Sequence, residues 1–106
     1  MDFQLSEQHR MIRDLARDFA RGEIEPVAAR LDAEKRFPRE ILAKAAGLGL
    51  MGITVPAEYG GAGLDMLAYI LILEEVAKAC ASTCVILSVH NTLASGSILR
   101  FGNEEQ

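Results

Sequence analysis

The sequence has 106 residues, of which 11 are basic and 15 acidic, so its formal net charge is −4, and 50% of the residues are apolar. This apolar content excludes a disordered chain and fits one globular domain. The acidic balance argues against a nucleic-acid-binding protein, because an acidic surface repels phosphate. Two cysteines are too few for a disulfide scaffold.

The sequence also lacks the marks of a membrane-spanning or exported protein. Its longest apolar run, residues 66–73, has eight residues, whereas a membrane-spanning helix needs about 20. The first residues show no basic segment followed by an apolar one and a small-residue cleavage site. We therefore expect no membrane span, no targeting peptide and a cytoplasmic location.

Charged side chains are unevenly distributed along the chain. Residues 1–44 carry nine basic and nine acidic side chains, residues 45–106 carry two basic and six acidic ones, and none stands between Ala79 and Leu99. The first part therefore predicts helices with one solvated face. The second part predicts helices that are covered on most sides, by a missing domain, a cofactor or another subunit.

Three helices are predicted in the charged part. The first begins at the N-cap Ser6, and its apolar stripe comprises Met11, Ile12, Leu15, Ala16, Phe19 and Ala20. Arginines and aspartates share the opposite side, which favours a solvated, ion-paired face over a phosphate site. Gly22 loosens this helix before Pro26 begins the second, and the third runs from Pro38 to Gly47.

Two further helices are predicted in the apolar part. Residues 53–55 are expected to be extended, and a glycine-rich loop follows over residues 60–63. Asp65 caps a fourth helix that ends near Cys80, and a fifth helix, starting at residue 82 or 83, breaks at Gly96. The expected fold is all-α, an up-and-down bundle of about five to six helices.

Residues 103–106 have the pattern of a capping box, with Asn103 as N-cap and Gln106 three positions later. This pattern predicts a further helix that the end of the chain cuts off in its first turn. We therefore expect a truncated bundle, taken from a longer polypeptide.

Two glycine motifs resemble nucleotide-binding loops only in their letters. Residues 47–52 read G-x-G-x-x-G, but a dinucleotide fingerprint follows a strand and opens a helix, whereas here a helix precedes and an extended segment follows. Residues 60–63 lack the lysine and hydroxyl of a phosphate-binding loop. Both motifs are interpreted as turns.

Outside these loops, few residues are candidates for metal binding or catalysis. Cys80 and Cys84 have too few partners for a zinc site and no base for nucleophilic catalysis, so we interpret them as buried free thiols. Glu74 and Lys78 have the spacing of a surface ion pair on a helix, which we prefer to an acid–base pair of carboxylates. No catalytic, cofactor-binding or metal-binding residue is assigned.

The fifth predicted helix is the best candidate for a functional surface. Four of its residues can share one face, an apolar wall with a single polar group: Ile86, Val89, His90 and Leu93. Ordinary core packing with a hydrogen-bonded histidine is the alternative, and periodicity alone favours it.

Several segments, in the same order along the chain, resemble the acyl-CoA dehydrogenases. The long motifs are V-P-A-E-Y-G-G-A-G-L-D at residues 55–65, C-A-S-T at residues 80–83, S-V-H-N-T-L at residues 88–93 and F-G-N-E-E-Q at residues 101–106. Shorter matches lie at residues 3–8, 37–38, 48–53 and 74–75. The segment from Cys80 to Leu93 is most similar to short-chain and butyryl members of this family.

The resemblance implies an N-terminal helical domain, followed in the family by a middle β-domain and a C-terminal helical domain that are absent from residues 1–106. It implies an FAD enzyme in which a glutamate takes the α-proton of an acyl-CoA and the β-hydride goes to flavin. Electrons then pass to an electron-transfer flavoprotein, and the family assembles as tetramers. It also implies that Ile86, Val89, His90 and Leu93 line the acyl-chain cavity.

The glutamates of this sequence do not match the family's base, so the chain alone is expected to be inactive and to hold no FAD. The alternative from another class is a stand-alone helical module that uses its apolar surface for protein interaction or assembly. A metal or redox module built on Cys80 and Cys84 is a weaker possibility, because ligands are lacking.

Overall fold

A computed structural model describes residues 2–106, of which none lies in a strand. About 71% of the chain is helical, which confirms the all-α prediction. The helices are α1 (Glu7–Phe19), η1 (Ala20–Ile24), α2 (Glu25–Glu34), α3 (Arg39–Gly47), η2 (Ala57–Tyr59), α4 (Met66–Ala79), α5 (Ala81–Val89), η3 (His90–Ala94) and α6 (Ser95–Phe101).

These elements join into four continuous helical rods, so the predicted count of five to six is slightly wrong. The π-helical segment η1 connects α1 to α2, and η3 connects α5 to α6. The expected interruptions at Gly22 and Gly96 fail because both residues stay helical. A π turn contains one more residue than an α-helical turn and does not end the helix. Periodicity and glycine content do not reveal such a turn.

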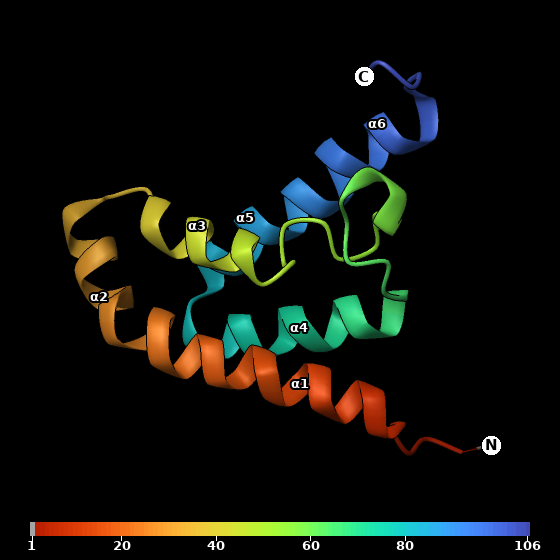
Figure 1. The fold of residues 1–106 in the computed structure, drawn as a ribbon. Coiled ribbons are helices and arrows are strands. Elements are labelled where there is room, and N and C mark those ends of the chain that lie inside the picture. The colour runs from red at the N-terminus through yellow and green to blue at the C-terminus, as the bar shows by residue number, and fades with distance from the viewer. Residues whose placement is uncertain (1) are drawn as a thin grey trace.

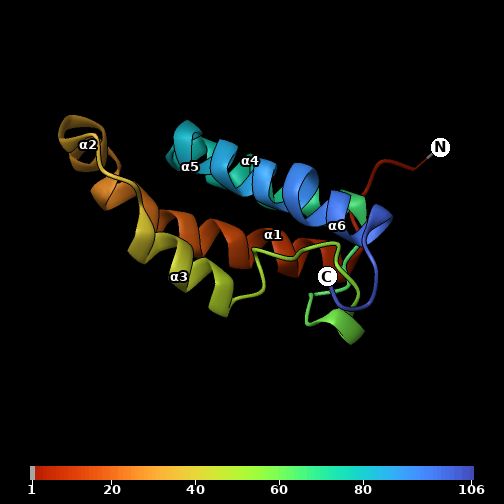
Figure 2. The same cartoon turned by 90° about the horizontal axis from the view of Figure 1, so that it is seen from above.

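The rods form two layers with alternating directions. Figure 1 shows α1 and α4 running parallel, while α3 and the rod α5–η3–α6 run the opposite way. In Figure 2, α4 lies with α5 and α6 in one layer, and α1 lies with α3 in the other. The up-and-down arrangement is therefore as predicted, and it leaves the outer face of the α4–α5 layer without a covering helix.

The N-termini of α1 and α4 are capped as predicted and are joined to each other. Ser6 Oγ accepts a hydrogen bond from His9 N at 3.1 Å, and Asp65 Oδ1 accepts one from Ala68 N at 2.9 Å. His9 Nε2 lies 3.0 Å from both carboxylate oxygens of Asp65. The hydrogen bond from Ala68, followed by that from His9, holds the pKa of Asp65 below its ordinary value.

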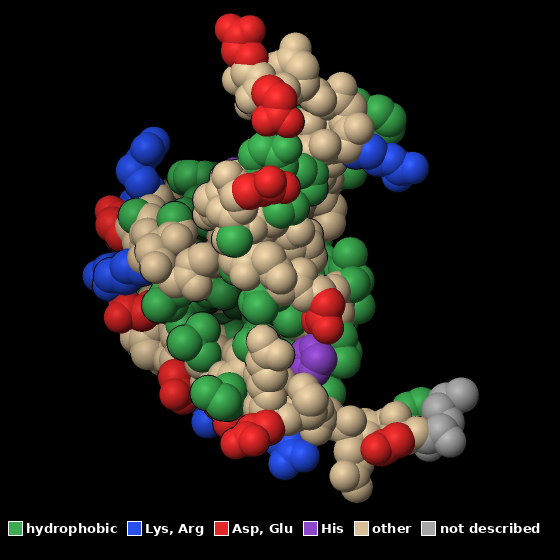
Figure 3. All heavy atoms as spheres, turned by 45° about the vertical axis from the view of Figure 1, so that its right-hand side comes forward, with side chains coloured by type: hydrophobic (Ala, Val, Ile, Leu, Met, Phe, Trp, Pro, Cys, Tyr) green, Lys and Arg blue, Asp and Glu red, His purple; other side chains and the backbone are tan. Residues whose placement is uncertain are grey.

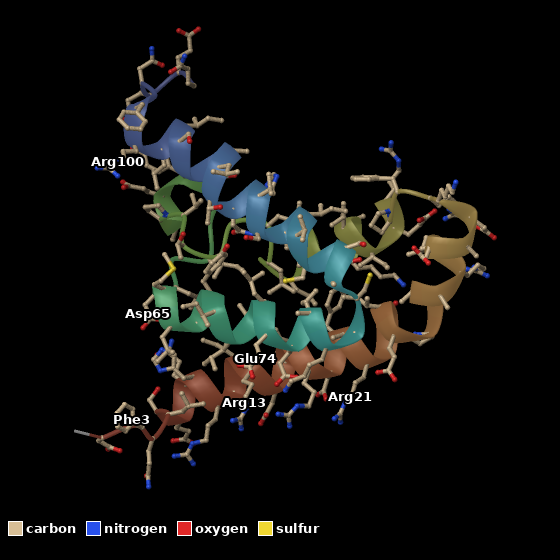
Figure 4. The ribbon with its side chains drawn as sticks, turned by 180° about the vertical axis from the view of Figure 1, so that it is seen from behind. Phe3, Arg13, Arg21, Asp65, Glu74 and Arg100 are labelled. Atoms are coloured by element: carbon tan, nitrogen blue, oxygen red, sulfur yellow. The ribbon has the colours of Figure 1, made fainter. Side chains whose placement is uncertain are left out.

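The core lies between the two layers. It receives Ala16, Phe19 and Ala20 from the first rod, Ile41 and Leu42 from α3, Ile72 and Val76 from α4, and Leu87 from α5. The apolar stripe predicted for α1 is only partly buried, because Met11 and Leu15 remain exposed. In Figure 4, Arg13 of α1 and Arg21 of η1 lie on the outer side of the first rod.

A buried carboxylate joins α1 to α4. Glu75 is only 5% exposed, and it pairs with Arg17 at 3.3 Å and Lys78 at 3.2 Å. The i,i+4 spacing had predicted that Lys78 pairs with Glu74. Lys78 pairs with Glu75 instead. Burial alone would raise the pKa of Glu75, but the hydrogen bonds from Arg17 and Lys78 outweigh burial and place the pKa below its ordinary value.

A compact loop carries the chain from α3 to α4. Residues 48–55 form turns and bends, so the expected extended segment is not a strand. The loop closes through backbone hydrogen bonds from Ala62 N to Gly52 O and from Leu64 N to Ile53 O. A Cβ on Gly61 would lie 2.1 Å from Val55 O, so this close approach requires glycine. Both glycine motifs thus serve as turns.

The C-terminal residues form the reciprocal hydrogen bonds of the predicted capping box. Asn103 Oδ1 accepts from Gln106 N, and Gln106 Oε1 accepts from Asn103 N, both at 3.0 Å. Tyr59 OH donates to Glu104 Oε1 at 3.0 Å and so ties this segment to the loop before α4. No helix among residues 2–106 is long and apolar enough to cross a membrane.

Candidate functional site

The rod α5–η3–α6 carries all four residues predicted to form a wall, but it places them in two environments. Ile86 is half-buried and packs against the core. Val89 and Leu93 are 44% and 68% exposed, while His90 is half-buried. The structure therefore groups Val89 and Leu93 on an open surface and directs Ile86 toward the inside of the domain.

We call the exposed large apolar side chains of α5 and η3 the α5 strip; they are Val85, Val89 and Leu93. Helix α4 has a similar α4 strip, made of Met66, Leu67 and Ile70. Figure 3 shows apolar side chains reaching the surface on one flank, whereas charged side chains crowd the other. The exposure of both strips agrees with the prediction that the helices of the apolar part require cover.

Ile86 belongs to a separate groove at the other side of α5. This groove lies between the start of α5 and the α2–α3 connection, and its apolar lining includes Leu31, Phe37, Pro38 and Ile86. The polar part of the lining comes from Asp32, Lys35, Arg36, Ser82 and Thr83. The groove is thus amphipathic, whereas the α5 strip is wholly apolar.

The two helices that bear the strips are fixed to each other by a hydrogen bond. The hydroxyl groups of Tyr69 on α4 and Ser88 on α5 lie 3.0 Å apart. Tyr69 is buried and Ser88 half-buried, so this bond forms away from bulk water. It joins α4 to α5 one residue before Val89.

Asn91 is the most highly connected polar side chain of this region, and sequence reasoning did not single it out. Its Oδ1 accepts from Ile53 N at 2.8 Å. Its Nδ2 donates to Leu50 O at 3.0 Å and to Leu87 O at 2.8 Å. The only signal in the sequence was its place in the S-V-H-N-T-L match, because its partners at positions 50 and 53 are distant along the chain.

The π turn η3 begins where two side chains donate to carbonyls one helical turn back. Asn91 Nδ2 donates to Leu87 O, and Thr92 Oγ1 donates to Ser88 O at 2.7 Å. Such back-bonding competes with regular backbone hydrogen bonds and bends helices. The consecutive Asn91 and Thr92 therefore give a local reason for the widened turn between Val89 and α6.

The two thiols of this region are poorly suited to nucleophilic chemistry. Cys80 and Cys84 are both free, but they are half-buried and not buried as predicted. Burial, with a smaller effect from Cys80, raises the pKa of the Cys84 thiol. A protonated thiol is a poor nucleophile. No group of three or more His, Cys, Asp or Glu side chains could hold a metal ion among the described residues. The arrangement can bind and shield apolar groups.

Comparison with known proteins identifies the class of this domain. The family described as "Acyl-CoA dehydrogenase, N-terminal domain" matches residues 6–106. The chain belongs to the acyl-CoA dehydrogenase family and corresponds to its N-terminal domain.

The similar sequences include short-chain enzymes from animals and bacteria. The mitochondrial short-chain specific acyl-CoA dehydrogenase of Bos taurus is 52% identical over 103 residues, which cover 97% of this chain and 25% of the relative. The short-chain specific acyl-CoA dehydrogenase of Clostridium acetobutylicum is 45% identical over 106 residues, covering 100% of this chain and 28% of the relative. The chain thus spans about a quarter of the length of these relatives.

Solved structures agree with this grouping. Butyryl-CoA dehydrogenase from Megasphaera elsdenii superimposes with a TM-score of 0.90 at 32% identity, covering 99% of this chain and 28% of that chain. A chain from the structural study "Electron transferring flavoprotein of Acidaminococcus fermentans: Towards a mechanism of flavin-based electron bifurcation" superimposes with a TM-score of 0.94 at 40% identity, with the same coverage.

Proposed function

We propose that this chain is the N-terminal domain of a cytoplasmic, FAD-dependent acyl-CoA dehydrogenase and forms part of its acyl-chain pocket. The enzyme oxidises the α,β bond of short-chain acyl-CoA thioesters and passes the electrons to an electron-transfer flavoprotein. Its middle β-domain and C-terminal helical domain lie outside these 106 residues. The observation that carries the proposal is the 52% identity to a short-chain specific relative over 97% of the chain.

The two apolar strips support the proposed pocket role. An acyl chain offers only CH2 and CH3 groups, which are stabilised by burial against apolar side chains at about 0.8 kcal/mol per CH2. Val89 and Leu93 present such side chains at the surface, and His90 adds one polar group beside them. In the proposed enzyme these residues form the wall of the pocket at the end of the acyl chain and keep water out.

The same residues do not fit the charged part of FAD. The flavin cofactor carries a pyrophosphate, which proteins neutralise with cationic side chains or helix N-termini. No charged side chain stands between Ala79 and Leu99, the segment that bears the α5 strip. We therefore place no flavin ligand on the α5 strip, and we propose that the isolated chain is catalytically inactive.

Assembly follows from the same surfaces. We assign to the full-length enzyme the tetrameric, homo-oligomeric state that the family resemblance implies, because other domains or subunits would cover the open strips. The structural neighbour from a study of an electron transferring flavoprotein supports that type of redox partner.

A mass measurement separates this proposal from the stand-alone assembly module. The proposal predicts that the native gene product has a mass several times the 11.5 kDa of these residues. A native product near 11.5 kDa would contradict the proposal and favour the assembly module.

The pocket role is tested by Val89→Phe in the full-length polypeptide. The larger side chain shortens the pocket, so kcat/KM for octanoyl-CoA falls more than that for butyryl-CoA, by at least about tenfold. Met11→Phe is the control, because it places the same aromatic ring at an exposed position of α1 and leaves both strips untouched. An unchanged ratio of the two kcat/KM values in Val89→Phe would contradict the role, and failure of the wild type to oxidise any acyl-CoA would contradict the function.

A further inference from the structure

The function proposed above makes no use of the three hydrogen bonds of the Asn91 side chain, which we call the Asn91 clamp. Asn91 is only 3% exposed, yet its side chain forms three hydrogen bonds to backbone groups. Asparagine is less favourable than leucine or alanine inside a helix. Core packing alone would therefore be served better by an apolar residue at this position.

The three partners explain why an amide is needed. Ile53 N and Leu50 O have no backbone partner among the hydrogen bonds of residues 2–106, and both residues are buried. A buried backbone group without a partner costs about 1–3 kcal/mol. Only an amide side chain offers one acceptor and two donors at the same point, so the donor and acceptor roles of Asn91 follow from its partners.

The clamp acts between two segments that are distant in the sequence. Residues 50–53 belong to the loop after α3, whereas Asn91 lies in η3 between Val89 and Leu93. Because Asn91 also donates to Leu87 O, it connects the loop to the last turn of α5. The side chain therefore fixes the π turn against a buried part of the opposite layer.

The π turn controls how the residues on its two sides face each other. Residues of a regular α-helix follow one another at about 100°, and a π turn adds one residue to a turn. If η3 returned to regular α-helix, Leu93 would rotate relative to Val89, by up to about 100°. The relative direction of these two side chains thus depends on the interactions that hold η3.

We infer that Asn91 is a positioning residue that sets the shape of the acyl-chain wall through its clamp on the π turn. The inference rests on the proposed function, since it assigns a role in selecting acyl-chain length. Asn91 does not itself contact the acyl chain, because its polar atoms are used by backbone groups. It acts through Val89, His90 and Leu93, which flank it in the same turn.

The test uses Asn91→Leu in the full-length enzyme, with kcat/KM measured for butyryl-CoA and octanoyl-CoA. Leucine has a similar volume but no hydrogen-bonding group, so the π turn loses its clamp and the wall loosens. We expect the preference for butyryl-CoA over octanoyl-CoA to fall at least about fivefold. A merely structural role would reduce the amount of active enzyme for both substrates equally and leave their ratio unchanged.

Two further variants keep the test decisive. Tyr69→Phe removes the hydrogen bond between α4 and α5 without touching the π turn, and it should lower stability but keep the ratio of the wild type. Asn91→Ser, which leaves room for a bridging water, replaces Asn91→Leu if that variant does not fold, and it should shift the ratio in the same direction.

The outcomes separate the inference from the function beneath it. If Val89→Phe changes the ratio but neither Asn91 variant does, the positioning role is overturned while the proposed function stands. If the wild type oxidises no acyl-CoA thioester, both are overturned. If Tyr69→Phe shifts the ratio as much as the Asn91 variants, general loosening of the layer explains the result and the inference is overturned.

Discussion

Helices α1 and α4 pack side by side, but their outer faces have opposite characters. The outer face of α1 carries arginines and aspartates, among them Arg13, which lies 3.6 Å from Asp14. The outer face of α4 exposes the α4 strip of Met66, Leu67 and Ile70. Both helices pack their inner faces against the same core, so only their outer faces differ. The outer face of α1 is suited to contact with water, and that of α4 to contact with a further protein surface or an apolar ligand.

The largest expected effect comes from the loop that delivers the chain to α4. Gly61→Ala puts a Cβ 2.1 Å from Val55 O, which the backbone can relieve only by moving. We expect the free energy of unfolding to fall by more than about 3 kcal/mol, measured by urea denaturation. Gly47→Ala, whose Cβ meets nothing within 4 Å, is the control. Equal stability of the two variants would mean that the loop is not tightly packed.

The two faces of α4 can be compared directly. Ile72 is fully buried and Ile70 is 53% exposed, so the same isoleucine-to-alanine exchange probes both faces of one helix. Ile72→Ala is expected to cost about 3 kcal/mol of unfolding free energy in urea, and Ile70→Ala less than about 0.5 kcal/mol. A large loss in Ile70→Ala would show that the strip is covered in solution. Reduced binding of a hydrophobic dye by Ile70→Ala would support an open strip.

The ion pair that joins α1 to α4 makes a pH-dependent contribution. Because the pKa of Glu75 is lower in the folded chain than its ordinary value, the carboxylate stabilises the fold above about pH 4.3. That contribution is lost as the pH falls through the folded pKa. Glu75→Gln should lower the free energy of unfolding by about 2 kcal/mol at neutral pH. The difference from the wild type should shrink below about pH 4, and a constant difference would contradict the assignment.

The smallest expected effect is a gain in the first rod. The Cβ of Gly22→Ala would meet nothing within 4 Å, and alanine is more favourable than glycine in a helix by about 1 kcal/mol. We therefore expect the free energy of unfolding, measured by urea denaturation, to rise by up to about 1 kcal/mol. A loss of stability instead would show that η1 needs the conformational freedom of glycine at this position.

Local sequence signals predicted a large part of this fold. The caps at Ser6 and Asp65 and the capping box at Asn103 depend on residues three positions apart, and all three form. The helical periodicity also predicted the all-α class. The π turns were missed because a π turn widens a helix without ending it. Gly22 and Gly96 were therefore misread as interruptions, although both stay helical.

Long-range contacts account for what could not be predicted about the candidate site. Glu75 is buried because Arg17, 58 positions earlier, reaches it across the layer, and no local pattern distinguishes it from Glu74. Asn91 is bound to residues 38 and 41 positions before it. The four wall candidates were chosen from helical spacing, which η3 alters. Their placement therefore depended on contacts that only the folded chain provides.

The bridge between Ser6, His9 and Asp65 has a consequence for how the domain opens. Because α1 and α4 are parallel, the positive ends of their dipoles meet at one edge, where Asp65 lies beside the first turn of α1 (Figure 4). The carboxylate that caps α4 thus also faces the first turn of α1. Fraying of either helix removes a partner from the other, so the two N-termini are expected to unfold as one cooperative unit and to exchange their amide hydrogens together.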